Sequence, residues 1–314
     1  MRIDGLLRAS ATRTPDAVAL VDYDGTPWRY AELLQASEKI ALRLAAQGVQ
    51  PNDRVLLVTE NCAALCAYIF ACSIAGAWAV PVNARMTAPE LDRIIDHAKP
   101  RIGVFFEDVS DDAGQHAERW NASGSPAIAE LGPSDPAQDA GVGVLLYTTG
   151  TTGTPKGVML THDNLVFAGK TSVNTRSLVA SDVIYGALPL THVFGMASML
   201  MASVHIGATI RLEARFAPAK LYQALTDGVT VLPAVPQMHA LLMQYTSEKG
   251  ITRMSGGTLR YVSSGAAPLD VVWKRKAEAF YGIALQNGYG MTETTAGVCT
   301  TQNTMGDPDI SVGP

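Results

Sequence analysis

Helical segments alternate with short apolar runs along the first third of the chain. Apolar side chains recur at helical spacing from 29 to 47 and stop at Gly48, and a Val- and Leu-rich run follows at 55–58. A helix at 89–97 and a strand at 102–106 repeat the pattern. The alternation predicts an α/β fold whose parallel-type sheets are flanked by helices on both faces.

The segment from Cys62 to Val82 carries no charged residue over a length that could cross a membrane. A buried helix that ends near Gly76 and continues into a strand at 78–82 is the alternative. Gly76 as a helix stop, Pro81 and the many alanines favour this alternative, and no basic cluster flanks the segment. We therefore expect a core helix and strand, and no membrane span.

The composition is typical of a folded protein and argues against a nucleic-acid-binding function. The 314 residues are 47% hydrophobic and 17% charged, which suits a packed core divided into two or three folding units. Lys and Arg number 24 against 29 Asp and Glu, so the net charge is -5, and neither sign forms a long run. Nucleic-acid binding is therefore not expected.

The four cysteines, at 62, 66, 72 and 299, lack the spacing of a metal site. Reduced core thiols in a cytoplasmic protein are the expected state. The first residues show no basic region followed by an apolar segment and a cleavage site, so no signal peptide is expected.

A boundary between two units is expected near residue 141. Residues 107–141 are rich in Asp, Gly, Ser, Pro and Ala with little periodicity, which is typical of surface connections. The predicted units are a first α/β subdomain at 1–141 and a second at 142–314. The second opens with strands at 142–147 and around 158–160, and a helix follows near Thr161.

The loop between those two strands has the groups that hold a polyphosphate. Residues 148–157 read TTGTTGTPKG, with several hydroxyls, unhindered backbone N–H groups and the ammonium of Lys156. Pro155 and Gly157 depart from the Walker A motif, and a polar linker is the alternative, against which the apolar flanking strands count. The candidate ligands to phosphate are Thr148, Thr149, Gly150, Thr151, Thr152, Gly153 and Lys156, with Thr152 also a candidate for magnesium.

Four ordered blocks carry a family resemblance. The run from Leu146 to Val158 resembles the signature phosphate loop of the acyl-adenylate-forming (AMP-binding) superfamily, which contains acyl-CoA synthetases, 4-coumarate ligases, luciferases and peptide-synthetase adenylation domains. LPLTHVFG at 188–195, SSGAAPL at 263–269 and QNGYGMTE at 286–293 follow in the family's order. The chain resembles the N-terminal portion of an acyl- or aryl-CoA ligase, and this resemblance implies that family's two helix-flanked sheets.

The resemblance assigns roles at the nucleotide. Tyr289 would stack on adenine, Thr292 would hydrogen-bond phosphate, and Glu293 would hold Mg²⁺, which suits an aromatic face and a hard oxygen ligand. Alone, this block would be a glycine-rich turn with a capped helix. The implied nucleotide-binding residues are Gly265, Ala266, Ala267, Asn287, Gly288, Tyr289, Gly290, Met291 and Thr292.

The block at 188–195 bears on the acid substrate. His192 would lie at the substrate carboxylate or the thiol entrance, whereas His162 is expected only to start a helix. The block has no acidic residue to pair with an α-amino group, so an amino-acid substrate is disfavoured. The candidate pocket residues, His192, Val235, Gln237, Met238, Ala266 and Met291, suit an aryl or fatty acyl group without choosing between them.

The implied reaction joins a carboxylic acid to ATP, giving acyl-AMP and pyrophosphate, and then to coenzyme A as a thioester. ATP, Mg²⁺ and coenzyme A are the implied cofactors and co-substrates. Catalysis would consist of charge neutralisation and positioning, with Lys156, His192, Thr292 and Glu293 as the implied catalytic residues.

The resemblance also implies that the final β-barrel segment is incomplete and that the C-terminal catalytic-lysine domain is absent, so little turnover is expected. A carrier-protein acyl ligase and a non-catalytic nucleotide- or acyl-binding module are the alternatives. The particular acid and the oligomeric state are left open.

Overall fold

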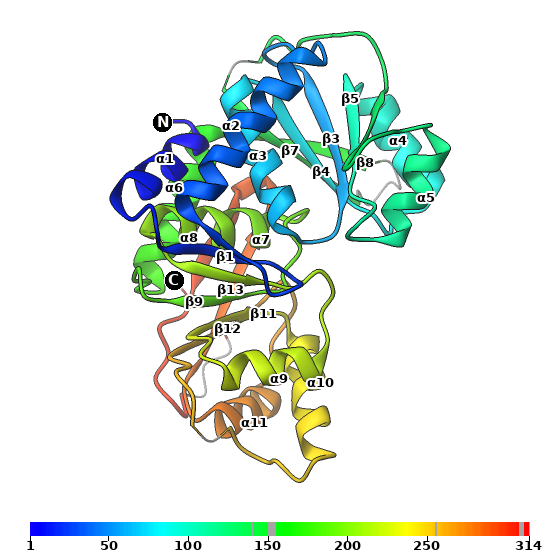
Figure 1. Ribbon diagram of the computed structural model, residues 1–314. Helices are drawn as coiled ribbons and strands as arrows, with labels where there is room; N and C mark the ends of the chain where they lie inside the picture. Colours follow the sequence, from blue (N-terminus) through cyan, green and yellow to red (C-terminus); the bar gives the residue numbers. More distant parts are fainter. Residues whose placement is uncertain (140, 150–154, 255, 308–310, 314) are drawn as a thin grey trace.

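The protein is described by a computed structural model that covers residues 1–139, 141–149, 155–254, 256–307 and 311–313. Two mixed sheets flanked by helices form its framework, one in the upper and one in the lower half of Figure 1. The α/β fold predicted from the alternating pattern is confirmed.

The upper sheet has six strands in the order β6-β5-β3-β4-β7-β8. Its centre, β5-β3-β4-β7, is parallel, and both edges are antiparallel. The strands are β3 (Arg54–Thr59), β4 (Trp78–Asn83), β5 (Ile102–Phe105), β6 (Ala127–Glu130), β7 (Val142–Thr149) and β8 (Pro155–Thr161).

The lower sheet has eight strands in the order β14-β13-β12-β11-β9-β10-β1-β2. It is again parallel except at its two edges, where β14 and β2 run antiparallel to their neighbours. The strands are β1 (Val18–Val21), β2 (Pro27–Arg29), β9 (Val183–Gly186), β10 (Thr209–Leu212), β11 (Val231–Ala234), β12 (Tyr261–Gly265), β13 (Leu285–Met291) and β14 (Ala296–Thr300).

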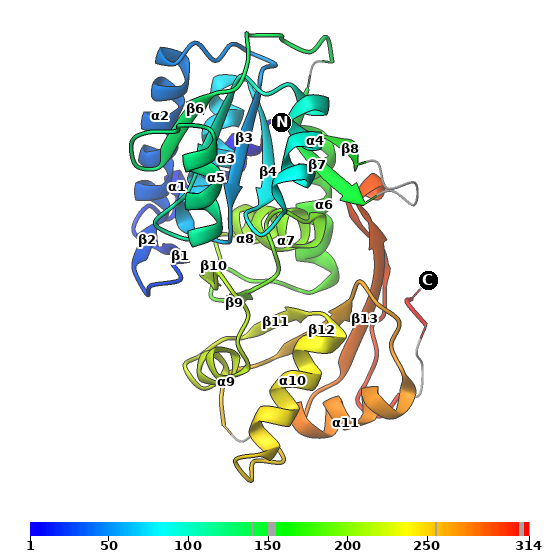
Figure 2. The same ribbon diagram turned by 90° about the vertical axis from the view of Figure 1, so that its right-hand side faces the viewer.

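Helices cover both faces of the lower sheet, with α6, α7 and α8 on one side and α9, α10 and α11 on the other (Figure 2). The helices are α1 (Ile3–Arg13), α2 (Tyr30–Ala46), α3 (Ala63–Ala75), α4 (Ala88–Ala98), α5 (Asp111–Arg119), α6 (His162–Thr175), α7 (Val193–Gly195), α8 (Ala202–Ile206), α9 (Pro218–Thr226), α10 (Pro236–Ser247) and α11 (Val271–Tyr281), with a π-helical segment η1 (Met196–Met201) and a 3₁₀ turn η2 (Thr292–Thr294).

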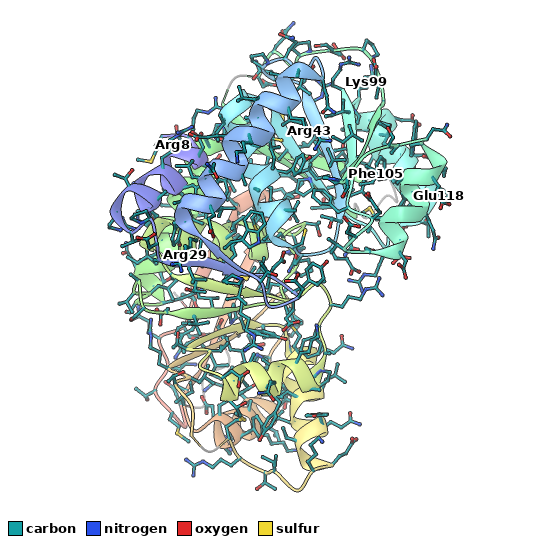
Figure 3. The ribbon with its side chains drawn as sticks, in the orientation of Figure 1. Arg8, Arg29, Arg43, Lys99, Phe105 and Glu118 are labelled. Atoms are coloured by element: carbon teal, nitrogen blue, oxygen red, sulfur yellow. The ribbon has the colours of Figure 1, made fainter. Side chains whose placement is uncertain are left out.

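Strand β3 shows how the core is divided. Every residue of β3 is buried. Val55 and Leu57 belong to the large core shared with α2, α3 and the lower sheet, while Leu56 and Val58 pack with α4 and α5 on the other face. Phe105 also lies in this second core, whereas the labelled charged side chains of Figure 3, such as Arg43 and Glu118, point outward.

The uncharged segment after Cys62 forms a core helix and a strand, as expected. Helix α3 ends at Gly76, whose φ of 79° is left-handed and therefore favours glycine, and β4 follows. In the described ranges, no helix combines the length and the apolar character needed to cross a membrane.

The interpretation of 107–141 as surface connection was wrong in part, because α5 and β6 lie within it. Helix α5 buries Ala113, His116 and Ala117, and β6 pairs antiparallel with β5. Alanine supplies most of the buried apolar surface of both elements, so they lack the run of large aliphatic side chains that usually marks a buried helix or strand. The boundary expected at 141 also differs from the division between the sheets, since β7 and β8 complete the upper sheet and β1 and β2 join the lower one.

Asn61 links the two halves through buried hydrogen bonds. It follows β3, and its Nδ2 donates to the carbonyls of Gly186 (3.0 Å) and Leu188 (2.8 Å). Its Oδ1 accepts from the N–H of Leu190 at 2.8 Å. One amide side chain from the upper sheet thus holds the backbone that leaves β9 in the lower sheet.

Replacing Asn61 by Leu should destabilise the protein strongly, because three buried backbone groups would lose their partner. We expect the free energy of unfolding to fall by about 3–5 kcal/mol, measured by urea titration. Asn174→Leu, at an exposed position of α6, is the control and should change it by less than about 0.5 kcal/mol. Equal effects of the two variants would contradict this role of Asn61.

His239 of α10 is fully buried and hydrogen-bonds to the backbone of β12. Its Nε2 lies 3.2 Å from the carbonyl oxygen of Ser263, which can only accept, so Nε2 carries the proton and Nδ1 accepts from the hydroxyl of Tyr281 at 2.8 Å. Burial lowers the pKa of His239 to about 4. The imidazole is therefore neutral in the folded protein at pH 7.

The lowered pKa predicts a loss of stability in acid. Below the ordinary histidine pKa of about 6.5, His239 binds a proton in the unfolded chain but stays neutral in the folded protein. The free energy of unfolding should therefore fall between about pH 6.5 and pH 4, with a contribution of about 3 kcal/mol from this group. His239→Gln should flatten that part of the pH profile in urea titrations. An unchanged profile in this variant would refute the assignment.

Candidate functional site

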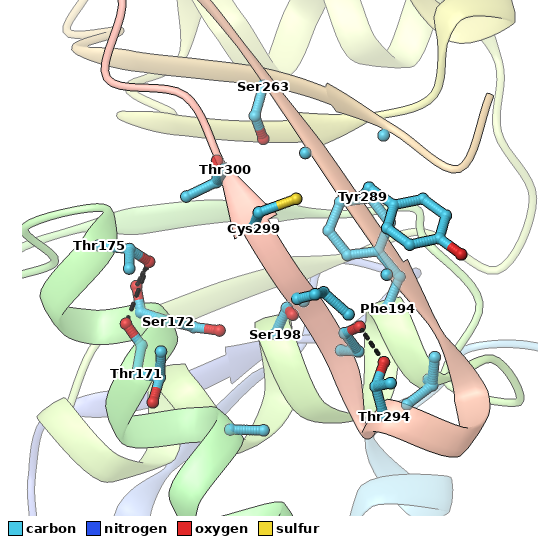
Figure 4. A pocket seen from close by; sticks show the side chains of 18 of the residues that line it. Thr171, Ser172, Thr175, Phe194, Ser198, Ser263, Tyr289, Thr294, Cys299 and Thr300 are labelled. Atoms are coloured by element: carbon cyan, nitrogen blue, oxygen red, sulfur yellow. Dashed lines mark hydrogen bonds between the residues drawn. The ribbon is translucent and has the colours of Figure 1, made fainter. Parts of the chain in front are cut away.

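A cavity of about 440 Å³ lies between α6 and the edge of the lower sheet. Its walls come from α6, from residues 192–198, from the end of β12 and from the β13–β14 hairpin. Figure 4 shows side chains from all four parts facing the same space, among them Thr171, Phe194, Ser263 and Thr300.

The backbone around the cavity adopts unusual conformations. Three of its lining residues, Ala266, Thr295 and Ala296, are left-handed without being glycine, with φ of 66°, 56° and 86°. Such conformations cost free energy and persist where the surrounding structure holds them, often at functional sites. Ala266 directly follows β12, Thr295 directly follows η2, and Ala296 is the first residue of β14.

Six predicted site residues line the cavity together. His192 comes from the start of α7, Gly265 and Ala266 from the end of β12, and the others from β13, although they are up to 98 positions apart in the sequence. β12 and β13 pair in parallel, with Gly265 opposite Gly288. The six are His192, Gly265, Ala266, Gly288, Tyr289 and Gly290.

His192 faces the cavity as a neutral hydrogen-bonding group. Its Nδ1 accepts from the N–H of Phe194 at 3.3 Å, which caps α7 and leaves the proton of the neutral ring on Nε2. Burial lowers the pKa of His192 below its ordinary value. The ring can therefore offer Nε2–H to an acceptor without carrying a charge at pH 7.

Tyr289 stands on the β13–β14 hairpin with half of its surface exposed. Gly290, the next residue, approaches β14 so closely that an added Cβ would lie 1.9 Å from the carbonyl oxygen of Ala296. Glycine is therefore required at 290, and this close approach sets the shape of the hairpin under Tyr289.

Part of the predicted phosphate loop is described and part is not. Gly150, Thr151, Thr152 and Gly153 lie outside the described residues, and Thr149 is described only through its backbone in β7. Thr148 of β7 pairs with Lys156 of β8, and Lys156 is exposed. Strand β8 contacts η2, which carries Thr292 and Glu293. The strand after the loop and the 286–293 block therefore meet in space.

The remaining predicted nucleotide residues lie near the cavity without lining it. Ala267, Met291 and Glu293 are exposed, and Thr292 is buried. Asn287 is buried, with its Nδ2 donating to the carbonyl of Ser311 at 3.0 Å. Their proposed roles at the nucleotide stay predictions.

Besides Met291, three residues predicted for the substrate pocket lie outside this cavity, and their roles stay predictions. Val235 precedes α10 and is half-buried, Gln237 is exposed, and Met238 belongs to the large core. None of the three lines the cavity of about 440 Å³.

Helix α6 supplies much of the wall, which the sequence motifs did not indicate. Its lining residues recur at helical spacing and are mostly small or hydroxyl-bearing: Asn164, Phe167, Ala168, Thr171, Ser172 and Thr175. Phe167 is 72% exposed, which is unusual for a large apolar side chain. A helical projection of 162–175 would have revealed this face, but not what it faces.

Arg176, directly after α6, is a second lining residue that no motif indicated. Its Nη1 donates to the carbonyl of Ser198 at 2.7 Å, and its Cζ lies 5.7 Å from the ring centroid of Phe194. Both partners belong to the segment that follows His192. A single arginine at the end of a helix has no distinguishing sequence signal, so only the tertiary structure could identify it.

The exposed carboxylate of Glu293 fits the way in which Mg²⁺ is held beside a nucleotide. Magnesium typically takes one or two carboxylates and completes its shell with phosphate oxygens and water. Across the described residues, no cluster of three or more His, Cys, Asp or Glu side chains could hold a metal ion by itself.

Known proteins are similar to this chain in sequence and in fold. A feruloyl-CoA synthase from an Amycolatopsis species is 32% identical over 294 residues, which are 92% of this chain and 59% of that protein. Apo MatB from Rhodopseudomonas palustris has a similar structure, with a TM-score of 0.81, 29% identity and coverage of 100% of this chain and 64% of the other.

A third similar protein is the O-succinylbenzoate coenzyme A synthetase MenE from Bacillus subtilis, in complex with ATP and magnesium ion. Its TM-score is 0.80 at 27% identity, with coverage of 98% of this chain and 64% of the other. This chain thus spans 59% to 64% of the length of the three similar proteins.

The family model described as AMP-binding enzyme matches residues 7–314, nearly the whole chain. The match includes the blocks that the fold assembles at the cavity, from the 192–198 segment to the β13–β14 hairpin. The chain therefore belongs to the AMP-binding enzyme family.

Proposed function

We propose that this chain binds ATP, Mg²⁺ and a carboxylic acid for an acid–thiol ligase that forms acyl-AMP and then a coenzyme A thioester. The main support for this proposal is that residues of three separate family blocks line one cavity, namely His192, Gly265 and Tyr289. The ATP- and magnesium-bound MenE, at 27% identity, supports the same ligands here.

The nucleotide would lie along the ends of β12 and β13. Tyr289 offers an exposed ring face for adenine, and the Gly265–Ala266 turn offers backbone without large side chains. Phosphates would extend toward β8, where Lys156 supplies a positive charge and Thr292 a hydroxyl nearby. Glu293 would hold Mg²⁺, which neutralises phosphate charge when it is bound.

The acid would enter the cavity with its carboxylate beside His192. Neutral Nε2–H can donate to a carboxylate oxygen and orient it toward the α-phosphorus. The substrate oxygen is the nucleophile, so the chain needs to supply positioning and charge stabilisation only. This agrees with a cavity built from Gly, Ser, Thr and aromatic residues.

Coenzyme A is the proposed thiol, in keeping with the feruloyl-CoA synthase and with MenE. A small carboxylic acid is the proposed substrate, and no nucleic acid or membrane span is invoked. The proposed location is the cytoplasm, which the buried free thiols of Cys62, Cys66 and Cys72 favour. A carrier protein as acceptor is the alternative that a direct comparison of the two thiols would test.

ATP with Mg²⁺ should stabilise the protein measurably. At a ligand concentration of about 100 times Kd we expect the Tm to rise by about 5 °C, while GTP, which lacks the adenine ring, should have a much smaller effect. Acid-dependent release of pyrophosphate would then support adenylation. Equal shifts with ATP and GTP, or no shift with either, would count against the proposal, and ATP binding without acid-dependent release would favour a binding module.

A matched pair of glycine variants tests the nucleotide side. Gly290→Ala places a Cβ against the carbonyl of Ala296, whereas Gly297→Ala, at the partner position of the hairpin, meets open space. We expect Gly290→Ala to abolish most of the ATP-dependent rise in Tm and Gly297→Ala to preserve it. Circular dichroism would establish that both variants are folded, and retained ATP binding in Gly290→Ala would argue against a nucleotide on this hairpin.

A further inference from the structure

The guanidinium of Arg176 places a positive charge on the cavity wall. Of the residues that line the cavity, all of which the structure describes, Arg176 is the only one that carries a formal charge at pH 7. The other side chains are apolar, amide, thiol or hydroxyl groups. The wall therefore has one point that would attract an anion.

The guanidinium of Arg176 is held in place but is not neutralised. It donates to the Ser198 carbonyl and lies over the Phe194 ring, and no carboxylate in the described ranges pairs with it. Only one of its five N–H donors is used by the described chain. Since it is half-buried, its charge is partly desolvated and meets no opposite charge in the described structure, a cost that a bound anion would offset.

Hydroxyl groups without partners face the same cavity. Ser263 and Ser264 of β12 are 5% and 1% exposed, and neither Oγ has a hydrogen-bond partner in the described structure. Buried hydroxyls normally have partners, so these two call for a polar occupant. In Figure 4, Ser263 and Ser198 approach one space from the sheet and from η1.

Phe194 lies between Arg176 and the β12 turn, so its ring sets the distance that a bound acid would have to span. Its ring lies beside the guanidinium of Arg176, and a Cβ added to Gly265 would be 3.2 Å from Phe194 Cε1. One aromatic ring therefore separates the charge from the β12 turn, where the reacting carboxylate would lie. The apolar face of Phe194 suits a hydrocarbon spacer of about that length.

We propose that the acid substrate is a dicarboxylic acid whose second carboxylate binds Arg176, with a spacer at least as long as a benzene ring. This inference rests on the proposed function, since it assigns the far end of the same substrate. A planar guanidinium matches a carboxylate through two parallel hydrogen bonds. An acid with an apolar tail would instead bury hydrocarbon against an unpaired charge, which disfavours it.

The test compares isosteric acids on the full chain in the presence of Mg²⁺ and a non-hydrolysable ATP analogue. Terephthalate is paired with 4-methylbenzoate and suberate with octanoate, and Kd values are measured by calorimetry. We expect each diacid to bind about ten- to a hundredfold more tightly than its partner. Arg176→Gln should remove this preference without changing the affinity for the ATP analogue.

Arg275→Gln is the matched control, because Arg275 is exposed on α11, on the opposite face of the lower sheet. It should retain the full preference for diacids. If the ATP analogue binds but diacids have no advantage, or if Arg176→Gln keeps that advantage or loses ATP-analogue affinity, the inference is refuted while the proposed function stands. If the unaltered chain binds no ATP analogue, the proposed function itself fails, and the inference with it.

Discussion

Parallel pairing of β12 with β13 is the constraint on which the candidate site depends. The pairing brings Gly265 opposite Gly288, so both strands end at one edge of the lower sheet. Backbone that leaves this edge turns through the left-handed residues Ala266 and Thr295 and surrounds the cavity. The antiparallel hairpin to β14 then closes one side, which is possible because residue 290 has no Cβ.

Buried polar groups secure this arrangement from outside the cavity. Asn61 ties the upper sheet to the backbone that leads to His192, and His239 hydrogen-bonds the carbonyl of Ser263 behind β12. On the far face, Lys274 and Glu278 form a buried ion pair at 3.0 Å, and Glu278 accepts from the N–H of Leu285 at the start of β13. Such a pair adds little net stability, because desolvation offsets much of its attraction.

Prediction from the sequence succeeded where a local pattern carries the information. The helix and strand after Cys62, with Gly76 between them, follow from composition and glycine conformation, and the glycine-rich blocks mark the strand ends that line the cavity. It failed for α5 and β6, where alanines supply most of the buried surface and large aliphatic side chains are few. It could not identify Arg176 or the α6 wall, because neither belongs to a motif. Both are recognised as part of the site only because the fold places them on the wall of the cavity.

The sequence by itself determined the α/β class, the family resemblance and the identity of the site blocks, because hydrophobic periodicity and glycine placement are local properties of a chain. Only the tertiary structure decided which blocks share a cavity, that β1 and β2 join strands almost 200 residues away, and that a lone guanidinium faces the site. Those facts depend on contacts between segments far apart in the chain. The long-range packing of two sheets sets such contacts, and no short stretch of residues encodes them.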